Sequence, residues 1–190
     1  MPGENTTIKA TWKINQYTIS FDSKGGSSVS SIRQDYGTIV NAPTSPIYTG
    51  YTFNYWYLKK SNTSYIFSTM PAKNLTLSAD WTIHRHDVKF IVDGEEYRTD
   101  RYNFNDSIVL PTLSKTGYTY DLWYTDDTFT SKISTATMLD EDIVLYNRSS
   151  INSYDVTYHI PGKEDKVETY EYNSSIDLTF DFNQGYAFSG

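Results

Sequence analysis

The sequence has 190 residues, no cysteine and a net charge of −7, with 23 acidic and 16 basic side chains scattered along the chain. The lack of cysteine excludes disulfides, thiolate metal sites and a cysteine nucleophile, and the scattered, acidic charge argues against nucleic acid as a partner. Hydrophobic residues reach only 38%, but 18 Tyr, 9 Phe and 4 Trp supply aromatic area that suits the cores of small β-sheets.

The chain opens with a segment that recurs further along. Residues 1–12 match residues 70–81, since both begin with Met-Pro and end in Ala-x-Trp, and a weaker copy begins at Met138. A second marker, Gly-Tyr followed by aromatic residues, begins at Gly50, Gly117 and Gly185. Both markers return with a period of roughly 68 residues, which indicates a tandem repeat.

The two markers divide the chain into four parts. We expect residues 1–16 to be the closing strand of a preceding repeat, 17–82 a first complete repeat, and 83–153 a second complete repeat with its junctions. Residues 154–190 are expected to be the truncated opening of a further repeat. The segment is therefore predicted to come from a longer array, with any signal peptide and anchor outside it.

Each repeat begins with a predicted β-hairpin. Residues 17–21 alternate as a half-buried strand does, and a Gly25-Gly26 turn leads to a second strand around residues 29–32. In the second repeat, residues 88–92 precede an Asp93-Gly94 pair suited to a type I′ turn.

A proline-marked crossing follows each hairpin, at residues 42–46 and 110–112, where a helix is not expected to propagate. The Gly-Tyr marker then opens a third strand, and residues 75–81 close the sheet as a fourth. We expect only short connectors between repeats, at residues 82–86 and 147–154. The prediction is a mainly β protein, with a small α+β fold as the alternative.

The first repeat contains a set of characteristic residues at defined spacings. They are Tyr36, Gly37, Pro43, Gly50, Tyr51, Phe53, Trp56, Tyr57, Met70, Asn74, Leu77, Ala79 and Trp81. This pattern resembles the Listeria–Bacteroides repeat family, close to the B repeat of internalin-type surface proteins, and it covers nearly the whole chain. The resemblance implies tandem β-grasp-like modules, each a small four-stranded sheet, in an elongated array on the bacterial cell surface.

The sequence departs from the family pattern at two places. The glycine that precedes Trp in the family is Tyr55 in the first repeat and Leu122 in the second. The Tyr36-Gly37 pair is replaced by Asn105-Asp106. A glycine would permit a bulge that turns Phe and Trp to one face, whereas a regular strand places residues three apart on opposite faces.

Aromatic side chains are the strongest candidates for binding. Tyr55, Tyr57 and Tyr124 are the predicted ligand-binding residues if their rings are exposed, because exposed rings stack on sugars or anchor protein interfaces. Packing within the core and across strands is the simpler expectation.

Metal binding and catalysis have weaker support in the sequence. His84 and His86 share a strand face and can hold a metal, but no third ligand is evident, so we expect a solvated linker and neither a metal nor a cofactor. The acidic runs 126–127 and 140–142 can bind calcium or form ordinary solvated turns. With three histidines and no nucleophile or phosphate-loop motif, the chain is not expected to be an enzyme.

The leading functional hypothesis is a non-catalytic stalk or spacer of an adhesin-like, extracellular cell-surface protein that presents a distal domain. One rival is a module that binds carbohydrate or a host or matrix protein, and another is a set of accessory repeats of a secreted enzyme. The expected partners include neighbouring repeats, and no membrane insertion is expected because no apolar stretch approaches the roughly 20 residues that a spanning helix needs. We expect a monomer, with head-to-tail strand exchange between the chain ends as the alternative.

Overall fold

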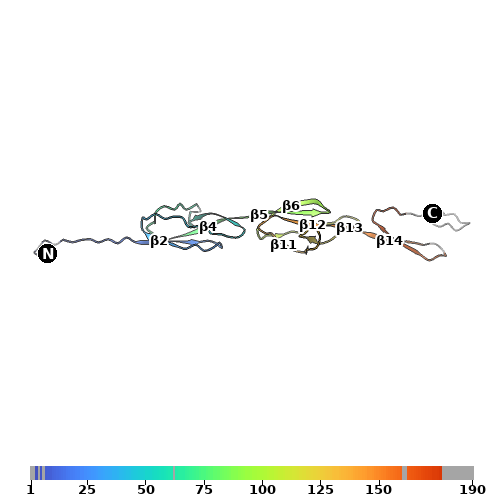
Figure 1. Ribbon diagram of the computed structural model, residues 1–190, viewed down its shortest axis with the longest axis horizontal. Helices are drawn as coiled ribbons and strands as arrows, with labels where there is room; N and C mark the ends of the chain where they lie inside the picture. The colour runs from blue at the N-terminus through green and yellow to red at the C-terminus, as the bar shows by residue number, and fades with distance from the viewer. Residues whose placement is uncertain (1–2, 4, 6, 62, 160–161, 177–190) are drawn as a thin grey trace. The chain divides into compact units, whose positions relative to one another are not determined.

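The computed structural model describes residues 3, 5, 7–61, 63–159 and 162–176, and none of these residues forms a helix (Figure 1). Strands joined by turns and irregular segments make up the described structure, which confirms the mainly β fold class. The described residues accordingly include no helix with the length and apolar character that crossing a bilayer requires.

The chain forms two compact units, and the first includes two short segments from the later part of the sequence. Unit 1 comprises Met1–His86, Tyr102–Asp106 and Met138–Glu141. Unit 2 comprises Asp87–Arg101, Ser107–Thr137 and Asp142–Gly190.

Unit 1 contains a four-stranded sheet in the order β2-β1-β4-β3. Its strands are β1 (Gln16–Asp22), β2 (Ile32–Asp35), β3 (Tyr51–Tyr57) and β4 (Leu75–Ile83). The central pair β1 and β4 is parallel, whereas β2 and β3 are antiparallel to their neighbours. This mixed order is that of a β-grasp-like sheet, and an irregular, proline-containing crossing between β2 and β3 replaces a helix.

The core of unit 1 lies on one face of this sheet. Alternate residues of a strand point to the same face, as the core residues Leu77 and Ala79 do on β4. The buried residues are Ile19, Val40, Trp56, Met70, Leu77 and Ala79. Aromatic rings then close the core, since the rings of Phe21 and Trp56 lie 4.7 Å apart between their centroids.

Unit 2 repeats the arrangement and adds one strand, in the order β10-β9-β12-β5-β6. These strands are β5 (Arg85–Val92), β6 (Glu95–Asn103), β9 (Trp123–Tyr124), β10 (Lys132–Ile133) and β12 (Ile143–Asn147). As in unit 1, the central pair is parallel, here β5 with β12. The β5–β6 hairpin is drawn in green in Figure 1.

Three two-stranded ribbons complete the described structure. They pair β7 (Ser107–Ile108) with β11 (Ala136–Thr137), β8 (Tyr118–Tyr120) with β13 (Ser149–Ile151), and β14 (Ser153–Tyr158) with β15 (Lys166–Glu171). The Gly185 copy of the Gly-Tyr marker lies outside the described residues.

One of the two predicted hairpin features is confirmed and the other is shifted along the chain. The Asp93-Gly94 turn has positive φ at both residues, 52° and 85°, as a type I′ turn requires. The second strand of the first hairpin is Ile32–Asp35 rather than residues 29–32, because Val29 leaves the strand alignment to pack against the core.

Candidate functional site

The aromatic strand β3 contains a bulge although it lacks the family's glycine. Phe53 pairs with Trp81 and Tyr55 pairs with Asp80, so Asn54 is the extra residue between them. The bulge turns Phe53 and Trp56 to the same face, where their ring centroids lie 5.3 Å apart. The regular-strand alternative, which places Phe53 and Trp56 on opposite faces, is therefore wrong.

Tyr55 and Tyr57 lie on the face of β3 opposite to the core. They flank the buried Trp56 in sequence and are themselves half-buried. Their ring centroids are 6.5 Å apart with an interplanar angle of 79°. Two of the three predicted binding residues thus share one partly accessible surface.

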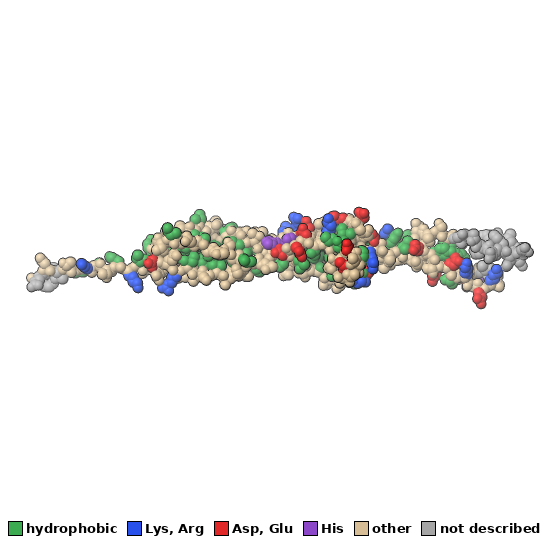
Figure 2. Space-filling view, viewed as in Figure 1, with side chains coloured by type: hydrophobic (Ala, Val, Ile, Leu, Met, Phe, Trp, Pro, Cys, Tyr) green, Lys and Arg blue, Asp and Glu red, His purple; other side chains and the backbone are tan. Residues whose placement is uncertain are grey.

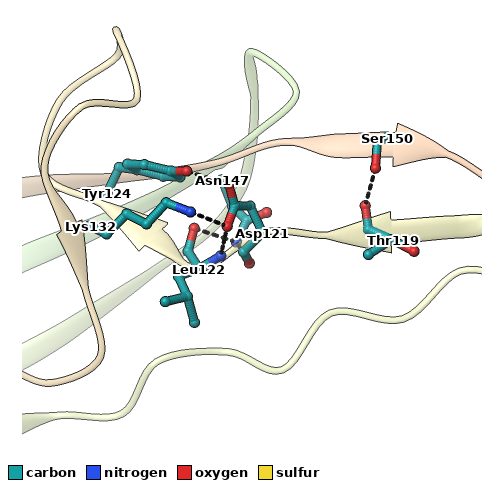
Figure 3. Close-up of polar contacts among 7 residues, drawn as sticks. All are labelled: Thr119, Asp121, Leu122, Tyr124, Lys132, Asn147 and Ser150. Carbon is teal, nitrogen blue, oxygen red and sulfur yellow. Dashed lines mark hydrogen bonds and ion pairs between the residues drawn. The ribbon is translucent and has the colours of Figure 1, made fainter.

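Tyr124, the third predicted binding residue, has no exposed surface, so the exposure expected of it is wrong. Its hydroxyl donates to the Asp121 carboxylate, and the Phe129 ring packs edge-on at 5.3 Å between centroids. Lys132 pairs with Tyr124 across the β9–β10 ladder. Figure 3 shows Tyr124, Lys132 and Asp121 meeting at one point. A ring enclosed in this way cannot stack on a ligand.

Asp126 holds the loop that encloses Tyr124. Its carboxylate accepts hydrogen bonds from the backbone N of Thr130 and Ser131, at 3.0 and 2.7 Å, and from the hydroxyl groups of Thr128 and Thr130. These donors, led by the Thr128 hydroxyl, hold the pKa of Asp126 well below its usual range. The acidic run at 126–127 therefore supplies a turn-forming carboxylate rather than a cluster of free calcium ligands.

Asp121 and Asn147 join the two halves of the broken third strand in unit 2. Asp121 accepts hydrogen bonds from Leu122 N at 2.8 Å and Lys132 Nζ at 2.9 Å in addition to the Tyr124 hydroxyl. The Tyr124 hydrogen bond, followed by that of Lys132, holds the pKa of Asp121 well below its usual range. Asn147 Nδ2 donates to the backbone O of Asp121 and Leu122, at 2.9 and 3.3 Å. Carboxylates saturated in this way are poor general bases, so the network is structural.

The outer face of the unit 2 sheet carries an open groove of about 690 Å³. Its apolar lining comes from Ile91, Phe129, Val144 and Tyr146, and its charged lining comes from Lys89 and Arg148 together with Asp93 and Asp127. The Arg148 guanidinium lies 4.7 Å from the centre of the Phe129 ring. Sequence reasoning missed this groove because its residues come from three separate stretches with no common motif.

The junction after the first repeat is fixed through a single residue, His84, which separates β4 from β5. His84 N donates to Gly50 O at 2.8 Å, and Phe104 N donates to His84 O at 2.9 Å. All three residues belong to unit 1. The Phe104 ring fills the space beside Gly50, which has a φ of 77°, so that a Cβ there would overlap the ring. The Gly-Tyr marker therefore provides a seat for an aromatic ring.

Unit 2 contains the same junction after the second repeat. Asn152 N donates to Gly117 O at 2.8 Å, and Tyr172 N donates to Asn152 O at 2.7 Å. The Tyr172 ring fills the space beside Gly117, whose φ is 78°. Its centroid lies 6.4 Å from that of Tyr118, the same separation as between Tyr51 and Phe104 in unit 1.

These hydrogen bonds correct one pairing expected from the sequence. The counterpart of Tyr36-Gly37 is Phe104-Asn105, not Asn105-Asp106. Gly37 N donates to Met70 O and Asn105 N donates to Met138 O, both at 2.9 Å. Asn105 has a φ of 67°, close to the 79° of Gly37, because asparagine is among the residues that tolerate this conformation.

His84 and His86 meet a third polar group that the sequence did not indicate. Asp140 Oδ1 lies 2.6 Å from His84 Nδ1 and 3.0 Å from His86 Nε2. Both histidines hold the pKa of Asp140 below its usual value, His84 more strongly. All three residues belong to unit 1, and Figure 2 shows histidine side chains in purple at the surface beside red acidic side chains. The expected solvated linker is instead an ordered cluster.

Comparison with known proteins identifies the repeat. The family profile of the Listeria-Bacteroides repeat domain matches residues 17–80 and 86–147. A protein of Evansella cellulosilytica, provisionally named a membrane protein, is 31% identical over 199 residues that cover 98% of this chain and 30% of that protein. Internalin H of Listeria monocytogenes is 31% identical over 160 residues, 78% of this chain and 29% of its own length. The chain thus spans less than a third of these relatives.

Among solved structures, domains 3–4 of the Streptococcal High Identity Repeats in Tandem from a cell surface protein align with 72% of this chain and 98% of theirs. The identity is 10% and the TM-score 0.30, values too low to carry a structural argument.

Proposed function

Because the chain belongs to the Listeria-Bacteroides repeat family, we propose that it is a spacer segment that holds a distal domain away from a bacterial cell surface. The observation that carries this proposal is the recurrence of one junction. Gly50 with Phe104 in unit 1 and Gly117 with Tyr172 in unit 2 form the same combination of backbone hydrogen bonds and a seated aromatic ring.

Such a junction suits a spacer for a physical reason. The residue between successive strands is hydrogen-bonded through both its N–H and its C=O, at His84 and again at Asn152. Few backbone dihedrals then remain free, and stacked modules with short, fixed connections resist bending more than modules joined by flexible linkers. We propose that the seated ring limits rotation at each junction.

Spin-label distances test this stiffness in the full chain. The chain has no cysteine, so Lys73→Cys in unit 1 and Thr112→Cys in unit 2 provide unique labels at exposed positions. We expect a narrow distribution of label-to-label distances that broadens on Phe104→Ala. Tyr97→Ala removes an aromatic ring that is 51% exposed on β6, and it should leave the distribution unchanged. A distribution as broad as that of a flexible linker before any junction substitution would overturn the proposal.

The proposed location is outside the cell, at its surface. Similarity to Internalin H and to the Evansella cellulosilytica protein whose name describes it as a membrane protein supports this location. Antibodies raised against the segment should label intact cells that produce the complete protein. Labelling only after the cells are lysed would contradict the proposal.

A binding function is the second candidate, and specific surfaces favour it. Tyr55 and Tyr57 present partly accessible rings, and the groove beside Tyr146 combines aromatic rings with charged groups of both signs, which suit a sugar or a polar protein segment. A screen against glycans and matrix proteins should therefore compare Tyr55→Ala and Tyr146→Ala with the unsubstituted chain. Binding that is lost in a folded variant would establish recognition, whereas no binding to either class would leave the spacer function as the better account.

A further inference from the structure

We propose that His84, His86 and Asp140 of unit 1 form a binding site for a divalent transition-metal ion of the zinc class. The proposal is independent of the spacer function, because it concerns the chemistry of one cluster rather than the mechanics of the array. Each residue contributes one ligand atom, and the three atoms all lie within 4.8 Å of one another.

The separations between these atoms are compatible with one shared ion. Zinc binds imidazole nitrogen and carboxylate oxygen at about 2.0–2.2 Å, so tetrahedral ligands lie roughly 3.4 Å apart. Asp140 Oδ1 now lies 2.6 Å from His84 Nδ1 and 3.0 Å from His86 Nε2. Each separation has to open by less than about 1 Å to admit the ion, a change that side-chain rotation can supply.

His84 is held in place by its backbone and by its second ring nitrogen. The backbone N and O of His84 bind Gly50 and Phe104, as described above. Thr52 Oγ1 lies 2.8 Å from His84 Nε2, on the side of the ring away from Asp140. Histidine ligands of metal ions usually have such a partner on the other nitrogen, because it fixes the ring orientation and the tautomer. A hydroxyl suits this role because it can donate or accept.

Asp140 is positioned by the segment that precedes it. Met138 is 1% exposed, its N donates to Asp106 O at 2.8 Å, and its O accepts from Asn105 N at 2.9 Å. The backbone two residues before Asp140 is therefore fixed within unit 1. Two histidines at alternate positions and an aspartate anchored this way form a largely prearranged set of donors.

The donor types select the class of ion. Two imidazoles and one carboxylate suit zinc and its neighbours in the first transition series, whereas calcium and magnesium prefer oxygen ligands alone. The side chains of His84, His86 and Asp140 remain 33%, 23% and 33% exposed, so an ion can enter and water can complete the coordination. Three protein ligands and one open position is also the arrangement of many catalytic zinc sites, although no reaction is proposed for it.

The chain contains a natural comparison for a cluster that is only an ion pair. His159 Nδ1 lies 2.6 Å from Asp165 Oδ1, the same separation as in the His84–Asp140 contact. The three-donor groupings of histidine, aspartate and glutamate in the described part of the chain consist of the His84, His86 and Asp140 set alone. If a simple His–Asp contact were enough to bind zinc, both places would bind it.

Calorimetric titration of the full chain, produced without a histidine tag, tests the proposal with zinc chloride as the probe. We expect one saturable site per chain, with calcium and magnesium giving no saturable heat. His86→Ala and Asp140→Asn should weaken zinc binding at least about 10-fold, whereas His159→Ala should leave it unchanged. No saturable zinc binding, or equal losses in His86→Ala and His159→Ala, would overturn the proposal.

Thr52→Val tests the arrangement without removing a ligand. It preserves the shape of the side chain but removes the hydroxyl that faces His84, so zinc binding should weaken about 10-fold. Addition of zinc should also shift the ring proton signals of His84 and His86 in NMR spectra and leave those of His159 in place. Shifts at all three histidines alike would indicate adventitious binding and contradict the site.

Discussion

The first and second repeats share a sheet order but differ in how they build the third strand. In the first repeat β3 runs without a break from Tyr51 to Tyr57 and absorbs its extra residue as a bulge. In the second repeat the same stretch is divided into β8 and β9, and Asp121 and Leu122 lie between them. Both solutions place a buried Trp, Trp56 or Trp123, in the core. The core tryptophan and the strand order are therefore kept, whereas the local hydrogen bonding varies.

The different third strands change the environment of the residue that follows each tryptophan. Tyr57 stays half-buried on the outer face of its sheet, whereas Tyr124 is fully enclosed by the loop that carries Phe129. Two tyrosines at corresponding positions therefore have different roles, one on a surface and one in a core. Substitutions at these positions and at their neighbours test whether the two tyrosines differ in this way.

The largest difference is expected between Tyr124→Ala and Tyr57→Ala. Removing a fully buried aromatic ring costs about 3–5 kcal/mol of unfolding free energy, because the contacts are lost and a cavity remains. Tyr57 loses only part of such contacts, and about 1 kcal/mol is expected. Hydrogen exchange measured over β12 and over β4 reports the two sheets separately. Equal losses at the two positions would show that the contrast in burial has no energetic consequence.

Substitutions at the two junction glycines should instead behave alike. Gly50→Ala and Gly117→Ala both place a Cβ at positive φ and against an aromatic ring, so each should lose about 1–3 kcal/mol. Amide exchange at Phe104 and Tyr172 should accelerate in the corresponding variant. Gly94→Ala is the matched control, since its φ is also positive but nothing lies within 4 Å of its Cβ position. A loss in Gly94→Ala as large as the others would assign the effect to backbone strain alone.

A smaller difference is expected between two asparagines beside the third strand. Asn147 is 2% exposed and donates to two backbone carbonyls at the strand break, whereas Asn54 is exposed and donates to the side chains of Asp80 and Thr82. Asn147→Ala should cost about 1–2 kcal/mol, because buried carbonyls lose their donor. Asn54→Ala should cost about 0.5 kcal/mol or less, since water replaces its partners. Urea-induced unfolding measures both, and a larger loss at Asn54 would contradict this account.

Repeat periodicity was enough to predict most of the fold. Two markers with one period located the third and fourth strands, and the Asp93-Gly94 pair predicted its turn, because these signals are local and have direct steric causes. The parallel pairing of β1 with β4 has no local signal, and the β-grasp-like arrangement came from the family resemblance.

The candidate sites were less predictable because they depend on contacts between distant residues. Asp140 lies 56 residues from His84, and no short motif joins them. Tyr124 is enclosed by a loop whose Phe129 ring packs against it. Phe129 has a φ of 57°, a conformation that its residue type does not predict. The bulge at Asn54 was left open because Tyr55 replaces the expected glycine. In each case tertiary packing determines the local structure and outweighs the conformational preference of the residue type.

The smallest expected effect is the loss of folding stability at low pH that is due to Asp121. Its counterpart in the first repeat is Asn54. Hydrogen bonds from Tyr124, Lys132 and Leu122 N hold the folded-state pKa of Asp121 below its unfolded value. Its contribution to stability is therefore fully present above the unfolded pKa of about 3.9, and it is lost as the pH falls through the folded pKa. The effect should be modest because the group is accessible to solvent and screened by salt.

Asp121→Asn isolates this contribution. The variant should be less stable than the unsubstituted chain at pH 7. The difference between them should shrink at pH 3, which lies below the unfolded pKa, because protons then bind the carboxylate of the unfolded chain and favour unfolding. Urea-induced unfolding at the two pH values, followed by NMR signals from β9 and β12, measures it in the second sheet. Asn54→Asp is the reciprocal change. Because Asn54 Nδ2 donates to Asp80 Oδ2 at 2.8 Å, the variant places two carboxylates together, and its stability relative to the unsubstituted chain should rise rather than fall as the pH is lowered. A difference between Asp121→Asn and the unsubstituted chain that stays constant from pH 7 to pH 3 would mean that the carboxylate's charge does not stabilise the broken strand, and that its shape alone holds Tyr124 in place.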